Sequence, residues 1–435
     1  MAFVHADSCE CAKSELDLFS VPPTQTSVES GRWVEYHPVS SITANSPIEF
    51  EINGSGEDYL DFANTYLHVR AKITKAAGAD LADDSKTGPI NLFMHSLFSQ
   101  VDISLNGTQI TSSTSTYPYR AIIETLLSYG QESKLTQMRA ALYIKDTANK
   151  MDEVADDNEG LLARRAYTAE SKVVEMMGRI HADLFFQERY MLNEVTTKIK
   201  LVRSKDAFCL MMENASTDAV SVVSAALYVR KVKLTPSVFL AHAKALEQSN
   251  AKYPIRRVVC KSFTAPQGVS DFSNEKVFSG QLPARLIVGL VENAAYNGSK
   301  TKNPYNFRHF NASEVAVHVD GQQQQAIKPL RPDFTSGHYI SAYLSLFSGT
   351  GKINRDDGNF VSREDYPNGY ALYAFDLSPD LAEDDHFNLS REGSIRLTMR
   401  FSQPLTASVT VITYAEYENV IEIDRNRNVL FDFSS

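Results

Sequence analysis

Apolar and polar residues alternate in many segments along this chain, and this alternation restricts the fold more than any other feature. It is clearest at residues 48–52, 67–73, 195–201 and 395–401. A period of two places successive side chains on opposite faces of a strand, whereas an amphipathic helix has a period near 3.6. The pattern therefore predicts half-buried antiparallel strands. A chain of 435 residues is long enough for about two domains.

A similar motif occurs once in each half of the chain. Pro89 begins a segment that passes through an alternating run to an Asn-Gly pair, and Pro304 begins one that ends in an Asp-Gly pair. The two intervals from proline to glycine differ by one residue. Such pairs between alternating runs predict two-residue hairpins with positive φ. The halves are therefore expected to be a duplicated unit. The expected structural turn residues are Asn106, Gly107, Asp320 and Gly321.

Each half also has a short apolar segment after its hairpin and closes with further strands. Units of about 200 residues with many short antiparallel strands suit an eight-stranded β-sandwich of the jelly-roll type. We predict an all-β fold, a tandem double jelly roll with short helices and long loop insertions. The expected division is an N-terminal arm at 1–30, a first jelly roll at 31–235, a connector at 236–254 and a second jelly roll at 255–435.

Some segments depart from regular alternation. Residues 75–86, 131–172 and 349–368 are polar and irregular, and we expect loops there. Loops this long are uncommon unless they have a task or are disordered. The alternation that includes Val229 also changes phase before Val232, which predicts a β-bulge near Arg230.

Composition and charge argue against several classes of protein. No segment approaches the 20 or so apolar residues of a membrane-spanning helix, and the first 30 residues are acidic rather than basic and then apolar. We therefore expect no transmembrane segment and no secretory signal peptide. The formal net charge is −10, and no basic block occurs. Direct sequence-specific binding of nucleic acid is not expected.

The residues that carry chemistry form no recognisable site. Cys9, Cys11, Cys209 and Cys260 include no C-x-x-C pair, and the histidines lack the close spacing of a metal-binding cupin. His181 and Asp183 would share one strand face without a third ligand, which favours hydrogen bonding over metal binding. Residues 348–352 resemble only the end of a P-loop. We predict a protein that is not an enzyme, with no catalytic, cofactor-binding or metal site.

Several further segments carry a family resemblance. They are Glu15–Phe19, Pro22–Thr26, Gly56–Thr65, Leu97–Val101, Leu201–Asp206, Pro236–Lys244 and Ala415–Ile421. Through them the chain resembles the double jelly-roll major capsid proteins of Polinton (Maverick) type virus-like elements and their adintovirus relatives. That family is related to the major capsid proteins of large double-stranded DNA viruses and virophages. The resemblance covers nearly the whole chain and is weakest over 131–172.

The resemblance implies a homotrimeric, pseudo-hexagonal capsomer, or hexon, built from six jelly rolls. Such capsomers would tile an icosahedral shell around double-stranded DNA. The implied partners are neighbouring capsomers and minor capsid and vertex (penton) proteins. The implied location is the virion, after synthesis inside the host cell. The duplicated unit, the acidic balance and the missing catalytic set agree with this.

Another class of protein remains open from the sequence. Tandem jelly rolls also serve in carbohydrate-binding and glycan-processing proteins. That alternative predicts aromatic platforms and an acid pair in a concave site, and a monomer would suffice. The oligomeric state therefore separates the two hypotheses.

Overall fold

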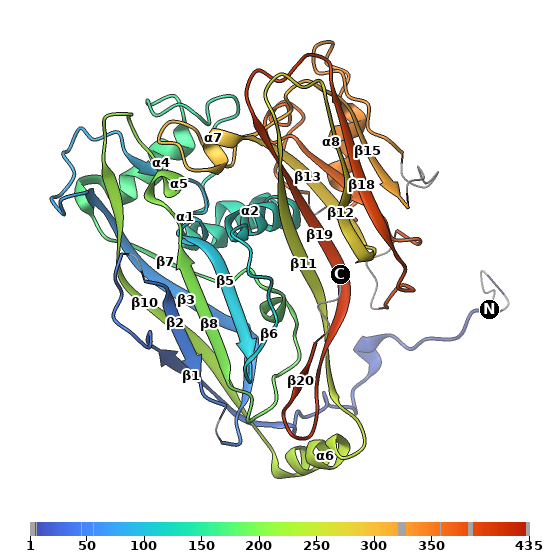
Figure 1. The fold of residues 1–435 in the computed structure, drawn as a ribbon. Coiled ribbons are helices and arrows are strands. Elements are labelled where there is room, and N and C mark those ends of the chain that lie inside the picture. The colour runs from blue at the N-terminus through green and yellow to red at the C-terminus, as the bar shows by residue number, and fades with distance from the viewer. Residues whose placement is uncertain are drawn as a thin grey trace.

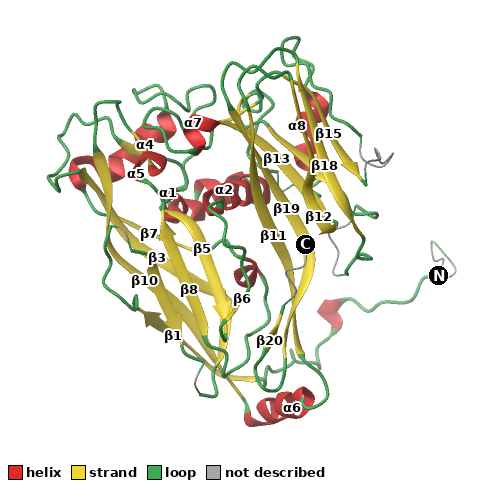
Figure 2. Cartoon of the chain, viewed as in Figure 1, coloured by secondary structure: helices red, strands yellow, loops and turns green. Residues whose placement is uncertain are grey.

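Two β-sandwiches stand side by side in the computed structural model, which describes residues 5, 7–44, 46–54, 56–320, 328–356, 358–381 and 386–431. The helix α2 (Tyr117–Ser128) lies between them (Figure 1). Figure 2 shows that strands build both sandwiches, and that α6 (Pro236–Leu246) lies at the opposite end of the molecule from several of the other helices.

The first sandwich consists of two antiparallel four-stranded sheets. One has the order β1 (Val28–Tyr36), β10 (Asp218–Leu234), β3 (Tyr59–Lys75) and β7 (Val174–Gly178). The other has the order β2 (Ile48–Ile52), β8 (Thr197–Arg203), β5 (Phe98–Leu105) and β6 (Thr108–Gln109). Ile48, Phe50 and Ile52 are buried and the residues between them are not. The alternation seen in the sequence thus separates the core face from the solvent face.

The second sandwich repeats this order. Its first sheet runs β11 (Ala251–Ala265), β19 (Val409–Ile423), β13 (Arg285–Glu292) and β17 (Leu372–Asp376), and β20 (Val429–Leu430) pairs with β19. Its second sheet runs β12 (Asp271–Gln281), β18 (Glu392–Phe401) and β15 (Ala312–Val319). A single bridge from Val315 to Leu330 takes the place beside β15 that β6 has beside β5. The predicted all-β tandem jelly roll is confirmed.

Shorter elements join the main strands. Two small ribbons pair β4 (Gly88–Pro89) with β9 (Leu210–Met211) and β14 (Phe307–Arg308) with β16 (Asn368–Gly369). The other α-helices are α1 (Phe93–Ser96), α3 (Gln131–Leu135), α4 (Glu159–Thr168), α5 (Asp206–Cys209), α7 (Asn293–Tyr296) and α8 (Ile340–Ser348). Short 3-10 helices lie at η1 (Ser14–Leu16), η2 (Gln137–Ala141), η3 (Ala169–Ser171) and η4 (Asp183–Phe186).

Strand pairing places two elements earlier than the expected division did. β1 begins at Val28, inside the expected arm, because it pairs with β10 as far as Leu234. β11 begins at Ala251, inside the expected connector, because it pairs with β19 as far as Ile423. The described residues 7–27, which precede β1, lie outside both sandwiches (Figure 1).

The turn residues of the two halves make the same contacts. Asn106 and Gly107, with φ of 45° and 85°, join β5 to β6. The Asn106 N–H donates to the Thr196 carbonyl (2.8 Å), and its Oδ1 accepts from the Thr196 N–H (2.7 Å). Asp320, with φ of 51°, makes these two contacts with Ser394, at 3.0 and 2.8 Å. Gly321 lies outside the described residues.

The irregularity near Arg230 involves extra residues in β3 rather than in β10. Tyr66 pairs with Tyr228 and Asp61 with Arg230, so residues 62–65 of β3 face Val229 alone. The Asp61 carboxylate accepts a hydrogen bond from Arg230 at 2.6 Å. The phase change in β10 thus reflects the extra residues of its partner strand β3, which the sequence of β10 does not reveal.

The expectation of a loop at 131–172 was wrong. The segment contains α3, α4 and two 3-10 helices, and its Lys134 and Arg164 are 2% and 0% exposed. Buried charged residues look like solvated ones in a sequence, because their partners are distant in the chain. The segment packs against residues 349–368, as described next.

Candidate functional site

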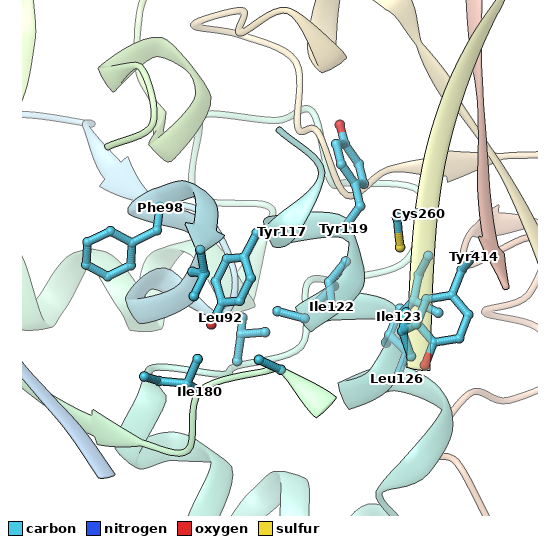
Figure 3. Close-up of a cluster of buried hydrophobic side chains, with 14 of the residues drawn as sticks. Leu92, Phe98, Tyr117, Tyr119, Ile122, Ile123, Leu126, Ile180, Cys260 and Tyr414 are labelled. Carbon is cyan, nitrogen blue, oxygen red and sulfur yellow. The ribbon is translucent and has the colours of Figure 1, made fainter. Parts of the chain in front are cut away.

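The strongest candidate site is the set of contacts between the two sandwiches, which we call the seam. Its centre is α2, whose residues 117–127 are all buried. Figure 3 shows Leu92 and Phe98 of the first sandwich on one side of α2, and Cys260 and Tyr414 of the second sandwich on the other. Pro118 lies in the first turn of α2, where proline favours helix initiation. The helix thus belongs to both cores at once.

A buried ion-pair network crosses the seam at α2. Arg120 contacts Glu124 at 2.8 Å and Asp183 at 2.7 Å. Asp183 also accepts a hydrogen bond from the N–H of Val258 in β11, and Glu124 accepts one from the Tyr414 hydroxyl. Burial raises the pKa of Asp183 more than Arg120 lowers it. The pKa of Glu124 lies below its ordinary value, because Arg120 and His181 outweigh its burial.

Two buried histidines lie beside this network. His181 Nδ1 is 2.6 Å from a Glu124 carboxylate oxygen, and His95 Nδ1 is 2.8 Å from the Tyr117 hydroxyl. The two rings meet edge to face at 4.5 Å. Burial and the neighbouring His181 hold the pKa of His95 well below its ordinary value. His95 is therefore neutral at neutral pH.

A second network centres on Asp146 in the 131–172 segment. Arg164 donates to its carboxylate at 2.6 Å and to the Pro89 carbonyl at 2.9 Å. Asn303 of the second sandwich donates to the same carboxylate at 3.2 Å, and the Tyr370 hydroxyl donates to the Asp146 carbonyl at 2.8 Å. Asp146 thus links a fully buried arginine of the first half to two residues of the second half.

Lysines of the same segment hold residues 349–368. Lys145 Nζ is 2.5 Å from Asp365 and donates to the Phe360 carbonyl at 2.7 Å. Lys134 Nζ donates to the Asn359 carbonyl at 2.6 Å, and burial lowers its pKa well below the ordinary value. Two of the three segments expected to be loops thus pair with each other across the seam.

A third set of contacts lies near the β19–β20 turn. Arg427 donates to the Asn193 carbonyl and to its side-chain oxygen, both at 2.9 Å. The Asn106 amide donates to the Arg427 carbonyl at 2.9 Å. The Tyr253 hydroxyl of β11 accepts from the Leu192 N–H at 3.1 Å. The predicted turn residue Asn106 therefore belongs to the seam, whereas Asp320 contacts Ser394 within the second sandwich.

The geometry of the seam suits mechanical connection better than catalysis. The charged groups described above contact opposite charges or oxygen acceptors, which satisfies them. Arg120, His181 and Asp183 also line a cavity of about 250 Å³. His181 and Asp183 lie after β7 rather than on a strand, and their partners are Glu124 and Arg120. Within the described residues, no three His, Cys, Asp or Glu side chains gather as they would around a metal ion. No helix in that part of the chain is long and apolar enough to span a membrane.

Most of the seam residues could not be found from the sequence. Asp146, Arg164 and Arg427 have partners far along the chain, so no local pattern identifies them. Arg120 and Glu124 left one signal, since a charged pair at i and i+4 inside an otherwise apolar helix is a candidate for a buried ion pair.

Comparisons with known proteins cover nearly the whole chain. No family model matches it. An uncharacterized protein of Caenorhabditis elegans, F54H12.2, is 26% identical over 430 residues, which are 95% of this chain and 99% of that protein. A chain from the cryo-EM structure of the Sputnik virophage has a TM-score of 0.67 at 12% identity, covering 100% of this chain and 94% of that chain.

Two named capsid proteins also match. The mavirus major capsid protein has a TM-score of 0.52 at 13% identity, covering 100% of this chain and 97% of that chain. The Faustovirus major capsid protein has a TM-score of 0.56 at 10% identity, covering 94% of this chain and 92% of that chain. This chain has the double jelly-roll fold. The seam is the junction between the two jelly rolls of that fold, and similarity at these identities concerns the fold itself.

Proposed function

We propose that this protein is a major capsid protein whose homotrimers, each with six jelly rolls, tile an icosahedral shell around double-stranded DNA. The observation that carries the proposal is the structural match, over 94% and 100% of the chain, to two named major capsid proteins. The ion pairs and hydrogen bonds of the seam support it, because they join the two jelly rolls. A subunit that tiles a shell must present its surfaces in fixed relative positions. The comparisons favour this role over the carbohydrate-binding alternative.

We also propose that a Polinton (Maverick) type element encodes the protein. The support is a relative of nearly the same extent in a nematode, together with the structural match to a virophage chain. The proposed location is the virion.

The proposed division retains an arm, two jelly rolls and a connector, now with the arm ending before Val28. Leu16, Leu18 and Phe19 of the arm are exposed. Exposed apolar residues on a segment outside both sandwiches suit contact with a neighbouring capsomer or a minor or vertex protein.

The test is to purify the full chain with nuclease and chelator present and to measure its mass by light scattering. We expect a particle of three times the 48.4 kDa chain, and hexagonal arrays or shells by electron microscopy. A stable monomer that forms no arrays would contradict the proposal and favour the carbohydrate-binding alternative.

A further inference from the structure

The seam uses unlike surfaces from the two jelly rolls. The first contributes the helix α2, and the second contributes the outer face of the sheet β11–β19–β13–β17, where Val258 and Tyr414 contact Asp183 and Glu124. Each jelly roll nevertheless has both surfaces, because the strand order repeats. One helix and one sheet face are therefore left over.

The helix left over is α8, the counterpart of α2. Helix α2 follows β5 and precedes the edge strand β7, and helix α8 likewise follows β15 and precedes the edge strand β17. Their N-cap residues Thr116 and Tyr339 share a φ of −118° and have ψ of 9° and 12°. The two helices thus enter from the same backbone conformation at the same point of the fold.

The two helices differ in what covers them. Residues 117–127 of α2 are all buried, whereas Ile340 and Leu344 of α8 are 41% and 45% exposed. Tyr343 and Phe347 are half-buried beside them. The spacing of these four residues places them along one face of the helix. Within the described residues, Ile340 and Leu344 are the exposed part of this face, whereas Tyr343 also contacts Tyr366.

The sheet face left over belongs to β1, β10, β3 and β7. It carries Trp33, which is 52% exposed and stacks on Tyr66 with ring centroids 5.8 Å apart. Tyr228 and Met177 lie on the same face, because their strand neighbours Leu227, Val229 and Met176 point into the core. An outward aromatic face of this kind marks an interaction surface. In Figure 1, β1 and β10 lie at the left of the molecule and α8 in its right half.

We propose that the apolar face of α8 docks on the outer face of the β1–β10–β3–β7 sheet of a second copy of this chain. We choose a second copy as the docking partner because this contact repeats, between chains, the helix-on-sheet contact that the seam makes within one chain. The two surfaces are unlike, so the contact is head-to-tail and closes into a ring if its rotation allows. The inference rests on the proposed trimer, since it names the surfaces that close it.

The sole tryptophan of the chain makes the contact measurable. In the full-length protein, Leu344→Asp should abolish the trimer in light scattering. It should also shift Trp33 emission to longer wavelength and make it easier to quench with acrylamide, although residue 344 is on the other docking surface. The matched control is Leu162→Asp, at an α4 residue that is 42% exposed, and it should leave the trimer unchanged. Circular dichroism verifies that each variant is folded.

A mixing experiment tests the head-to-tail geometry. Trp33→Glu should also give a monomer, and Val39→Glu, at a residue 67% exposed, should not. Mixed in equal amounts, the Leu344→Asp and Trp33→Glu monomers should form a dimer, because each retains the surface that the other has lost. If both variants still form trimers, or if the two monomers do not combine, this inference is overturned and the proposed function is left intact. A wild-type monomer would overturn the proposed trimer itself.

Discussion

At the scale of single residues, the charges buried in the seam should dominate its stability. The Arg120 side chain is 11% exposed and contacts Glu124 and Asp183. Arg120→Met leaves both carboxylates buried without their cation, which should cost about 3–5 kcal/mol in the free energy of unfolding. Arg32 also forms an ion pair, with Asp58 at 2.7 Å, but its side chain is 69% exposed. Arg32→Met should cost no more than about 1 kcal/mol. Chemical denaturation checks both values, and equal losses would contradict the argument.

The buried His95 should make stability depend on pH. Burial, and then His181, hold its folded-state pKa well below the ordinary value of 6.5. A pKa that is lower in the folded state gives stability that is full above the unfolded-state pKa and is lost as the pH falls. The melting temperature should therefore decrease below about pH 6.5. The lowered pKa of Glu124 adds a further loss at more acidic pH.

The variant that tests this is His95→Gln, which can still hydrogen bond to Tyr117. Its melting temperature should change less between about pH 7 and pH 5 than that of the wild type. The control is His37→Gln, at an exposed residue, which should keep the wild-type pH dependence. A steep wild-type dependence that persists in His95→Gln would assign the effect to other groups.

At the scale of elements, the 131–172 segment should resist proteolysis. Lys134 and Arg164 are buried, and a protease needs an exposed, mobile backbone. Trypsin should therefore cut after Lys13 of the exposed arm well before it cuts after Lys134 or Arg164. Mass spectrometry of the first fragments measures the order, and digestion in denaturant shows that all three sites can be cut. Early cleavage after Arg164 would contradict the packing described here.

The same segment shows what a sequence can and cannot predict. Strands were predictable because alternation is local, and the Asn106 turn was predictable because its residue types suit positive φ. The pairing of Lys145 with Asp365 depends on residues far apart in the chain. Its buried charges therefore resembled those of a solvated loop. For the same reason, the phase change at Arg230 was visible, but the extra residues of β3 that oppose it were not.

At the scale of the whole molecule, the arm should act between capsomers rather than within them. Phe19 of the arm is 98% exposed. Pro22 and Pro23 favour an extended course. Ordering such a segment costs conformational entropy that only contact with a partner offsets. The arm should therefore matter when capsomers meet and not when a trimer forms.

Deleting residues 2–24 should leave the trimer intact and impair shell formation. The deletion stops there because Gln25 accepts a hydrogen bond from the Val28 N–H, and the Ser27 carbonyl accepts one from the Thr235 N–H. These contacts hold the start of β1. Light scattering measures the trimer, and electron microscopy counts shells under conditions in which the wild type assembles. Phe19→Ser in the full-length chain is the companion variant, and it should reduce shell yield if the apolar contact matters rather than the length of the arm. Loss of the trimer on deletion, or shells formed as well as by the wild type, would show that the arm acts elsewhere.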